Sequence, residues 1–194
     1  MNREDEKWLH PSKKSSKKGQ NGTLGEKIND VTDTIFLGLG SNLDRPIRQI
    51  YRAIGSLGEF VDSIERANLY RSNPLGPQDQ PDFINTVIKG RTSLSPEDLL
   101  GFVKRIETYQ QRVKTVRWGP RTIDIDILYF GNLNFNSASL KIPHPEILKR
   151  SFVAIPLLDL LTNEITPTGD RIERKRYDAS TLVRIETQEE IQWL

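Results

Sequence analysis

The sequence predicts an α/β (α+β) domain in which a four-stranded antiparallel sheet carries two helices on one face. Segments with the apolar continuity or alternation of strands recur along residues 34–130, and two amphipathic segments with prolines near their starts lie between them. Their order, β-α-β-β-α-β, is that of a split β-α-β arrangement. The second face of the sheet is then left for a ligand or for later segments of the chain.

One strand and one helix are indicated near the start of this region. TIFLGL, at 34–39, is continuously apolar, as expected of a buried strand, and the GSN at 40–42 turns the chain. Apolar residues recur at helical spacing in the segment that follows. Pro46 suits the first turn of this helix and Gly58 suits its end.

Two more strands and a second helix follow. Residues 61–70 and 83–89 read as strands, and the segment between them is rich in Pro, Asn, Asp and Gly, which is typical of a loop. Ser95 and Pro96, followed by two acidic residues, predict a helix start that resembles a capping box. A second loop, at about 111–120, leads into the fourth strand.

The two ends of the chain differ from its centre. Residues 1–33 are rich in Lys, Ser and Gly, so we expect a disordered tail, and we expect residues 34–194 to form a single domain. Glu4, Asp5 and Glu6 argue against an organellar targeting peptide. Further along, HPEILKRSFVAIPLLDLL predicts an apolar helix, and IERKRYDASTLVRIETQ predicts a polar closing segment that could end in a strand.

Composition excludes several classes of protein. The 194-residue chain contains no cysteine, which excludes disulfides, thiolate metal sites and cysteine nucleophiles. No apolar run approaches the ~20 residues of a membrane-spanning helix, and the N-terminus lacks the apolar core of a secretory signal. A formal net charge of +2 is too small to argue for nucleic acid as a partner. We therefore expect a soluble, cytoplasmic protein without membrane or nucleic-acid partners.

The stretch RWGPRTIDIDIL, at 117–128, places two carboxylates on a predicted strand. Side chains alternate between the two faces of a strand, so Asp124 and Asp126 share one face about 6.6 Å apart. Ile123, Ile125 and Ile127 take the other face, toward the helices. Two convergent carboxylates suit Mg²⁺, which takes its remaining oxygen ligands from water and phosphates. The alternative is a solvent-facing strand with incidental acids.

Basic residues crowd the loop before this strand. They are Arg112, Lys114, Arg117 and Arg121. Arginine is suited to bidentate phosphate contacts, and a Mg-nucleotide phosphoryl-transfer site combines such arginines with metal-binding carboxylates. The combination therefore favours a phosphoryl-transfer enzyme, although the chain has no P-loop and no set of protein-kinase motifs.

The strand at 83–89 shows a similar asymmetry. Phe83 and Asn85 share one face, where an aromatic plane and a carboxamide could stack on a flat heterocycle and hydrogen-bond its edge. A buried Phe and a capped Asn are the alternative. His144 lies between two prolines in IPHPEILKR, where it could be structural or could contact a nucleotide.

Five motifs together resemble one enzyme family, 6-hydroxymethyl-7,8-dihydropterin pyrophosphokinase. They are GSN (40–42), NPLGPQDQPDFIN (73–85), RIE (105–107), RWGPRTIDIDIL (117–128) and PHP with a following Arg-x-Phe (143–152). The resemblance extends from Thr34 to about Leu160. It implies a ferredoxin-like core and an ATP-dependent diphosphotransferase of folate biosynthesis. Such an enzyme transfers the pyrophosphoryl group of ATP to the hydroxymethyl group of the pterin and releases AMP.

The resemblance also implies roles for individual residues. Two Mg²⁺ ions are expected between Asp124, Asp126 and the phosphates of ATP, the co-substrate. Arg112 and Arg121 are the expected catalytic arginines, which close on those phosphates. The expected pterin-binding residues are Ser72, Asn73, Pro74, Leu75, Phe83, Asn85, Trp118 and Phe152, with the pterin between Phe83 and Phe152. The expected ATP-binding residues are Glu107, Lys114, Ile127, Lys141, His144 and Arg150. A monomer that binds only small-molecule substrates is expected.

The chain departs from the family pattern at several positions. Phe83 stands where family members often have Tyr, a change that preserves stacking. The loop between Arg112 and Arg117 is one residue shorter than in a well-known form of the family. Lys104, Ser139 and Lys141 stand where that form has Gln, Arg and Thr.

Two other functions share parts of this pattern. A nucleotidyltransferase also combines a Gly-Ser turn with D-x-D, but its turn lies shortly before the first aspartate, whereas Ser41 lies far upstream of Asp124. A ferredoxin-like RNA-binding module would carry aromatic residues on its central strands. This chain carries carboxylates there, and carboxylates repel phosphate unless a metal is bound.

Overall fold

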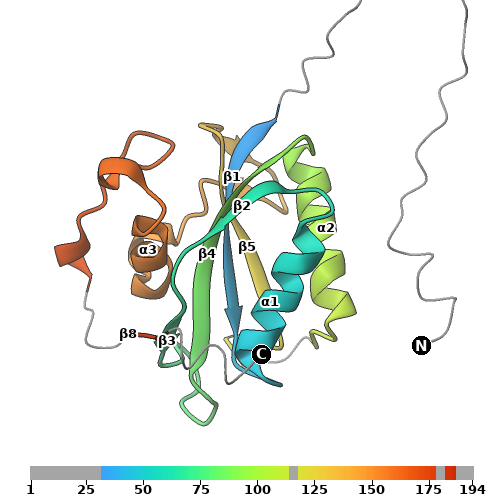
Figure 1. The fold of residues 1–194 in the computed structure, drawn as a ribbon, viewed down its shortest axis with the longest axis vertical. Helices are drawn as coiled ribbons and strands as arrows, with labels where there is room; N and C mark the ends of the chain where they lie inside the picture. Colours follow the sequence, from blue (N-terminus) through green and yellow to red (C-terminus); the bar gives the residue numbers. More distant parts are fainter. Residues whose placement is uncertain (1–31, 114–117, 178–181, 187–194) are drawn as a thin grey trace, which may run out of the picture.

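Two helices, α1 (Pro46–Leu57) and α2 (Pro96–Tyr109), lie on the same face of an antiparallel sheet, as the sequence predicts (Figure 1). The structure, a computed structural model, describes residues 32–113, 118–177 and 182–186. The strand order is β5-β1-β4-β3-β8, and β2 also pairs with β4. The predicted split β-α-β core therefore has the ferredoxin-like order, in a sheet that is wider than the four strands expected.

The strands in chain order are β1 (Asp33–Ser41), β2 (Asp62–Arg66), β3 (Tyr70–Ser72), β4 (Phe83–Thr92), β5 (Asp124–Phe130) and β8 (Leu182–Arg184), with a separate hairpin of β6 (Phe135–Asn136) and β7 (Lys141–Ile142). All pairings within the main sheet are antiparallel. β1 pairs with β4 on one side and with β5 on the other. Each paired residue of β1 therefore has a neighbour on β4 and a neighbour on β5.

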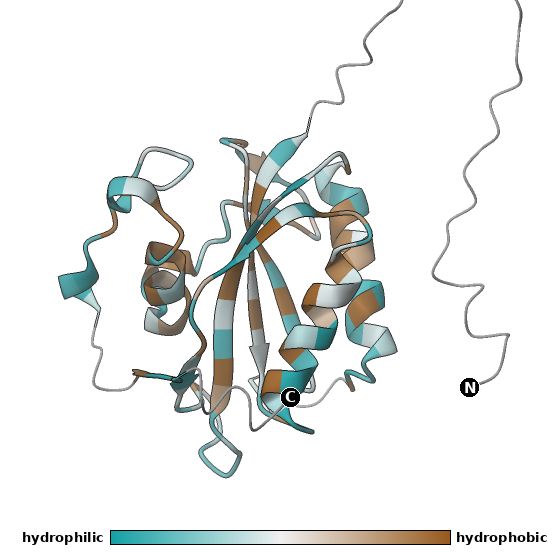
Figure 2. Cartoon of the chain, in the orientation of Figure 1, coloured by the Kyte–Doolittle hydropathy of each residue, from teal (hydrophilic) through white to brown (hydrophobic). Residues whose placement is uncertain are grey.

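Both helices form where the sequence predicts them. Each has a proline in its first turn, and Ser95 caps α2 because its side chain accepts a hydrogen bond from the Asp98 N–H at 3.1 Å. The apolar sides of both helices face the sheet (Figure 2). There, Ile50 and Leu99 belong to one buried cluster with strand residues such as Ile125. This cluster is the core on the helix side of the sheet.

The prediction of one strand at 61–70 is wrong, because two strands, β2 and β3, occupy this segment and both pair with β4. β2 contains a register shift, with Ser63 at a φ of 53°, and it ends at Arg66. The N–H of Asn68 is directed at the Asp159 carboxylate, 3.3 Å away, instead of at a neighbouring strand. That partner lies 91 residues further along the chain, so the local pattern carries no sign of the break.

The second face of the sheet is partly covered by α3 (Ser151–Leu158), the apolar helix predicted from the sequence. Ile155 and Leu157 belong to a second buried cluster with Phe36 and Leu128. A register shift between β1 and β5 turns both Leu128 and Tyr129 toward this cluster. Beside α3, the same face opens into a pocket.

Short elements complete the C-terminal additions. The 3-10 turn η2 (Ile147–Lys149) precedes α3, and η3 (Thr162–Glu164) and η4 (Arg174–Arg176) lie between α3 and β8, the strand that the closing segment could contain. At the other end, β1 begins at Asp33, which the sequence assigned to the tail. The rest of the predicted tail lies almost wholly outside the described residues. In the part of the chain that the structure describes, no helix is long and apolar enough to cross a membrane.

Candidate active site

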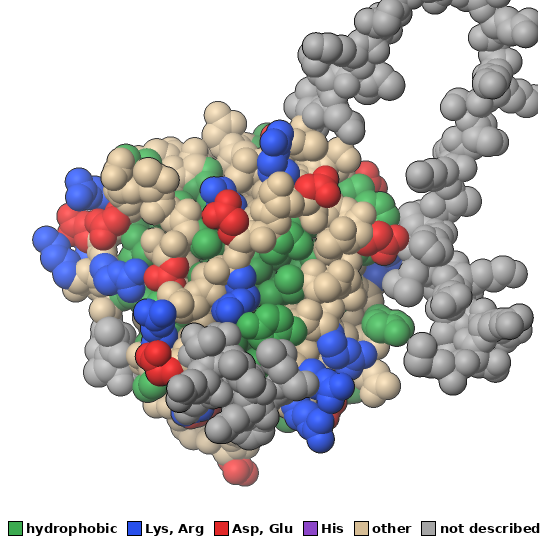
Figure 3. Space-filling view, in the orientation of Figure 1, with side chains coloured by type: hydrophobic (Ala, Val, Ile, Leu, Met, Phe, Trp, Pro, Cys, Tyr) green, Lys and Arg blue, Asp and Glu red, His purple; other side chains and the backbone are tan. Residues whose placement is uncertain are grey.

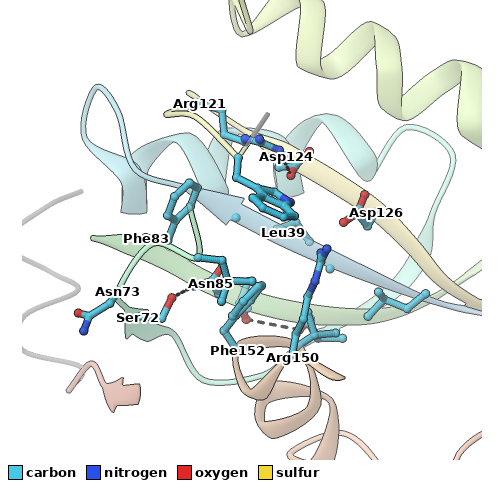
Figure 4. Close-up of a pocket in the computed structure, with 18 residues that line it drawn as sticks. Leu39, Ser72, Asn73, Phe83, Asn85, Arg121, Asp124, Asp126, Arg150 and Phe152 are labelled. Carbon is cyan, nitrogen blue, oxygen red and sulfur yellow. Dashed lines mark hydrogen bonds and ion pairs between the residues drawn. The ribbon is translucent and has the colours of Figure 1, made fainter. Parts of the chain in front are cut away.

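An open pocket lies beside α3 on the second face of the sheet (Figure 4). The empty space within it and at its open mouth amounts to about 730 Å³. Residues of β1, β3, β4, β5 and α3 line it, together with the loops that precede β4 and β5. The predicted site residues that line it are Ser72, Asn73, Leu75, Phe83, Asn85, Trp118, Arg121, Asp124, Asp126, Arg150 and Phe152. One pocket therefore contains most of the site expected from the sequence.

The two aspartates of β5 line the pocket, whereas the isoleucines that alternate with them are buried on the helix side. Asp124 and Asp126 contribute to the pocket wall. Ile123, Ile125 and Ile127 belong to the cluster beneath α1 and α2. The strand alternation predicted from the sequence is thus confirmed, and both carboxylates face the same space.

Gly40 of β1 lies between the two ends of the pocket. Its register partners are Asp124 on β5 and Asn85 on β4. A Cβ atom at Gly40 would lie 3.0 Å from Asn85 Oδ1, which is tight. The missing side chain therefore leaves the space between the carboxylate and the carboxamide open.

Both oxygens of the Asp124 carboxylate bind arginines. Arg112 Nη2 lies 2.8 Å from Asp124 Oδ1, and Arg121 Nη1 lies 2.5 Å from Oδ2. Arg112 also forms an ion pair with Glu107, whose carboxylate accepts the Ile125 N–H at 2.9 Å. The two predicted catalytic arginines thus converge on a predicted metal ligand.

Asp126 has a different environment, since it forms no ion pair with any described residue. Burial raises the pKa of its carboxyl group above the ordinary value, and the neighbouring Asp124 charge raises it further. His144, Lys104 and Arg150 act in the opposite direction. Arg150 extends from the start of α3 toward Asp126 (Figure 4). Cationic groups on several elements thus influence this carboxylate without binding it.

The carboxylate pair fits Mg²⁺. Asp124 and Asp126 offer oxygen donors on one face, and the described residues contain no group of three or more His, Asp or Glu side chains that could hold a metal. Mg²⁺ usually takes one or two carboxylates and completes its coordination with water and substrate phosphates, so two carboxylates are enough. Asp124 would first have to release an arginine.

The opposite end of the pocket is aromatic. Phe83 at the start of β4 and Phe152 in the first turn of α3 lie near Asn85 and Ser72 (Figure 4). Asn85 Nδ2 donates a hydrogen bond to Ser72 Oγ at 2.9 Å, which orients the carboxamide. Trp118 lines the same pocket and is 46% exposed. Aromatic planes beside an oriented amide can hold a flat, polar heterocycle.

A buried amide connects two loops that border the pocket. Asn42 Oδ1 accepts the Arg121 N–H at 2.8 Å, and Asn42 Nδ2 donates to Pro81 O at 2.9 Å and to Gln80 Oε1 at 3.1 Å. Gln80 Nε2 in turn donates to Trp118 O at 3.0 Å. The sequence indicated only a turn at Asn42, because its partners lie far along the chain.

The comparison with known families decides between the functions that this geometry allows. The model of the family 7,8-dihydro-6-hydroxymethylpterin-pyrophosphokinase (HPPK) matches residues 36–162. This chain belongs to the HPPK family. A Haemophilus influenzae 2-amino-4-hydroxy-6-hydroxymethyldihydropteridine pyrophosphokinase is 40% identical over 141 residues, which are 72% of this chain and 88% of that protein. A protein of the same name from Aquifex aeolicus is 41% identical over 134 residues, 69% of this chain and 84% of the relative.

Solved HPPK structures share the fold. A Plasmodium falciparum HPPK-DHPS chain has a TM-score of 0.58 at 15% identity, covering 73% of this chain and 40% of that one. A second structure of that protein has a TM-score of 0.56 at 15% identity, and the match covers 75% of this chain and 45% of that one. This chain therefore spans less than half the length of those chains, and at such identity the likeness concerns the fold alone.

Membership of the HPPK family confirms the predicted activity. The enzyme transfers pyrophosphate to hydroxymethyldihydropterin in folate biosynthesis, and HPPK enzymes use ATP as the co-substrate. The nucleotidyltransferase and RNA-binding alternatives are thereby set aside.

Some residues that the HPPK resemblance suggests do not line the pocket. They are Pro74, Glu107, Arg112, Ile127, Lys141 and His144. The Ile127 side chain is 3% exposed in the core beneath the helices, and Glu107 is 4% exposed, in ion pairs with Lys104 and Arg112. Lys114 lies outside the described residues.

Other pocket residues were not selected from the sequence. They are Gly38, Leu39, Gly40, Thr86, Val87, Leu128 and Val153. Most are small or apolar side chains on strands, which look like ordinary core residues in a sequence. Only the GSN motif, which includes Gly40, stood out in the sequence; its prediction as a turn is wrong at Gly40 and Ser41, because both residues pair within the sheet as the end of β1.

Proposed function

We propose that this HPPK chain binds both substrates side by side in the one pocket, with the pterin between Phe83 and Phe152. Asn85, oriented by Ser72, would read the edge of the heterocycle, as would the backbone of residues 72–75. The support is the aromatic end of the pocket and the 2.9 Å Asn85–Ser72 hydrogen bond. The remaining space of the pocket is then available to ATP.

The ATP phosphates would lie beside Asp124 and Asp126. The observation that carries this proposal is the position of Gly40, which pairs with Asn85 on one side and with Asp124 on the other. Neighbouring strands are about 4.8 Å apart, so Asn85 and Asp124, with β1 between them, lie about 9.6 Å apart, and a pterin hydroxymethyl group and a phosphate held at these two residues would meet over Gly40. Holding the two reacting groups together is a large part of catalysis in such transfers.

Cationic residues around the carboxylates would bind the triphosphate and the nucleoside. We assign His144 and Arg150 to this role because both act electrostatically on Asp126. We assign Lys141 because it lies on β7, which packs against β5. Glu107, Lys114 and Ile127 keep the ATP-binding roles that the resemblance implies, and Glu107 would act through the arginine that it binds.

Arg112 and Arg121 would transfer their contacts from Asp124 to the phosphates. Both arginines form ion pairs with Asp124. A polyphosphate offers a stronger anionic partner, and arginine suits bidentate phosphate contacts. The same exchange would free Asp124 as a metal ligand.

Two Mg²⁺ ions would be held by Asp124 and Asp126 and would neutralise the charge of the transferring pyrophosphoryl group. Trp118 would cover the pterin side of the pocket and limit the entry of water. Positioning and charge neutralisation would supply most of the catalysis of this in-line displacement. No side chain is assigned as a general base. The monomeric state and the cytoplasmic location stay predictions.

A substrate assay tests this arrangement. The protein is incubated with ATP, Mg²⁺ and 6-hydroxymethyl-7,8-dihydropterin, and the nucleotide released is identified. We expect AMP; release of ADP or of free pyrophosphate would contradict the reaction. Phe152→Ala should weaken pterin binding and leave the affinity for an ATP analogue unchanged, and equal loss of both ligands would contradict the separate subsites.

A further inference from the structure

The carboxylate of Asp159 stands at the C-terminal end of α3, where a negative charge opposes the helix dipole. Its side chain is only 14% exposed. Four donors bind it: Asn68 N at 3.3 Å, Asn68 Nδ2 at 2.8 Å, the Tyr70 hydroxyl at 2.8 Å and Arg174 Nη2 at 3.0 Å. Hydrogen bonds to a charged acceptor are strong and offset the unfavourable position. Asp159 does not line the pocket, so the proposed reaction does not use it directly.

On α3, Asp159 is aligned with a wall of the pterin site. Phe152 lies seven residues earlier, which is about two helical turns, so the two side chains leave the same side of the helix about 10 Å apart. A short helix moves largely as one body. Whatever holds Asp159 therefore also restricts the position of the Phe152 ring.

One donor of Asp159, Tyr70, lies on β3 and is thereby joined to the opposite wall. The register partner of Tyr70 on β4 is Asn85, and that of Ser72 is Phe83. Tyr70 is 6% exposed and points to the same face as α3, within the second buried cluster. The Tyr70–Asp159 hydrogen bond thus connects the helix that carries Phe152 to the strand that flanks Asn85 and Phe83.

We infer that Asp159 is a positioning residue for the pterin, which sets the separation between Phe152 on α3 and the wall formed by Phe83 and Asn85. The inference rests on the proposed pterin site. A stacking slot accepts a ring only over a narrow range of widths, and small misplacements of binding groups are costly. Loss of the Asp159 contacts should therefore affect the pterin far more than ATP, because Arg150, at the start of α3, is the one proposed ATP contact that this helix carries.

The C-terminal segment makes further contacts with Asp159 and with β3. Arg174 lies beyond the residues that match the family model, which end at 162, and β8 pairs with β3 along its whole length. The segment thus contacts both walls, through Asp159 and through β3. Acidic and basic side chains are intermixed over this part of the surface, at the left of Figure 3. Removal of the Arg174 side chain, which is 51% exposed, should have a smaller effect than changes at Tyr70.

The test measures the two ligands separately. Wild type, Asp159→Asn and Tyr70→Phe are titrated with 6-hydroxymethylpterin in the presence of Mg²⁺ and a non-hydrolysable ATP analogue, and then with the Mg-bound analogue alone. We expect each variant to weaken pterin binding by on the order of tenfold, as a small misplacement would, and to leave the affinity for the analogue unchanged. Tyr70→Phe keeps the ring and its packing, so it decides the question if Asp159→Asn does not fold.

Ile172→Val is the matched control, because Ile172 is 2% exposed in the same cluster and its apolar side chain cannot hydrogen-bond Asp159. If Ile172→Val lowers the melting temperature to the same extent and weakens the pterin equally, the effect is one of general stability and the inference is wrong. Unchanged pterin binding in Tyr70→Phe, or parallel loss of both ligands, overturns it as well. Phe152→Ala separates a failure of this inference from a failure of the proposed pterin site. If Phe152→Ala leaves pterin binding intact, the proposed pterin site itself is wrong.

Discussion

Arg112 and Asp124 form an ion pair in the active site, with Arg112 Nη2 2.8 Å from Asp124 Oδ1. Arg121 binds the other oxygen of the same carboxylate. A carboxylate with both oxygens bound to guanidinium groups is a poor ligand for Mg²⁺. Mg²⁺ and the two arginines therefore compete for this carboxylate, and a bound triphosphate would resolve the competition by giving the arginines another partner.

Arg112→Ala should increase the affinity for Mg²⁺ alone while it decreases turnover. Removing a cation from Asp124 favours another cation there, by on the order of tenfold, or about 1.4 kcal/mol. The phosphates lose a proposed partner, so turnover falls. Calorimetric titration with Mg²⁺ measures the first effect, with Arg105→Ala as the control, since Arg105 is exposed on α2. Unchanged Mg²⁺ affinity would mean that the ion pair does not compete with the metal.

Asp124→Asn and Asp126→Asn should each reduce turnover by on the order of a thousandfold, because a metal clamp contributes several kcal/mol to the transition state. Their effects on stability should differ. Asp124→Asn deprives two arginines of a charged partner and should cost about 1 kcal/mol, while Asp126→Asn removes a partly buried charge that no described cation binds and should cost nothing or stabilise. Steady-state kinetics and urea unfolding measure both. Near-normal turnover of Asp126→Asn would exclude its metal role.

Ile125→Asn is the converse change, one position away on the opposite face of β5. Ile125 is 1% exposed beneath the helices. An amide there has no partner and should cost about 2–4 kcal/mol, so the protein should unfold rather than lose a specific catalytic step. Circular dichroism against temperature checks this. A stable but inactive variant would show that the face assignment of β5 is wrong.

Asn42→Ala should lower turnover and stability together. The change removes the acceptor of the Arg121 N–H and the donor to Pro81 O, and buried groups left without partners cost about 1–3 kcal/mol each. The loop that carries Trp118 and Arg121 and the loop that carries Gln80 and Pro81 would lose their common anchor. Thermal unfolding and Trp118 fluorescence on addition of both substrates, in a background with Trp8 and Trp193 replaced, follow the two effects. An unaltered fluorescence response would indicate that the loops are positioned by other contacts.

Stability at alkaline pH should depend on Tyr70. Burial raises the pKa of the Tyr70 hydroxyl, and the hydrogen bond to Asp159 raises it further. The stability that the protonated hydroxyl contributes is present below the unfolded pKa of about 10 and is lost as the pH rises through the folded pKa. Wild type should therefore lose more stability than Tyr70→Phe above about pH 10. Urea unfolding across this range checks the difference. Burial also raises the pKa values of Tyr129 and Tyr177, so the variant retains part of the dependence.

The orientation of the two aspartates could be predicted from the sequence because it depends on local geometry. Alternation along a strand places Asp124 and Asp126 opposite Ile125 whatever the strand packs against. The same holds for the start of α2, where Ser95 and Asp98 form a cap within one turn. Motifs such as RWGPRTIDIDIL also identify the family and its reaction, because a run of characteristic residues in a fixed order can be recognised without knowledge of the tertiary structure.

Contacts between distant parts of the chain required the tertiary structure. The division of residues 61–70 into β2 and β3 depends on Asp159, and the restraint of Asp124 by Arg112 depends on how the end of α2 lies beside β5. Asn42 reads as a turn residue until its partners near Gln80 and Arg121 are in place. A local pattern specifies which face a side chain takes, because that depends on backbone geometry over a few residues. It does not specify the partner on that face, because partner choice depends on the packing of the whole domain.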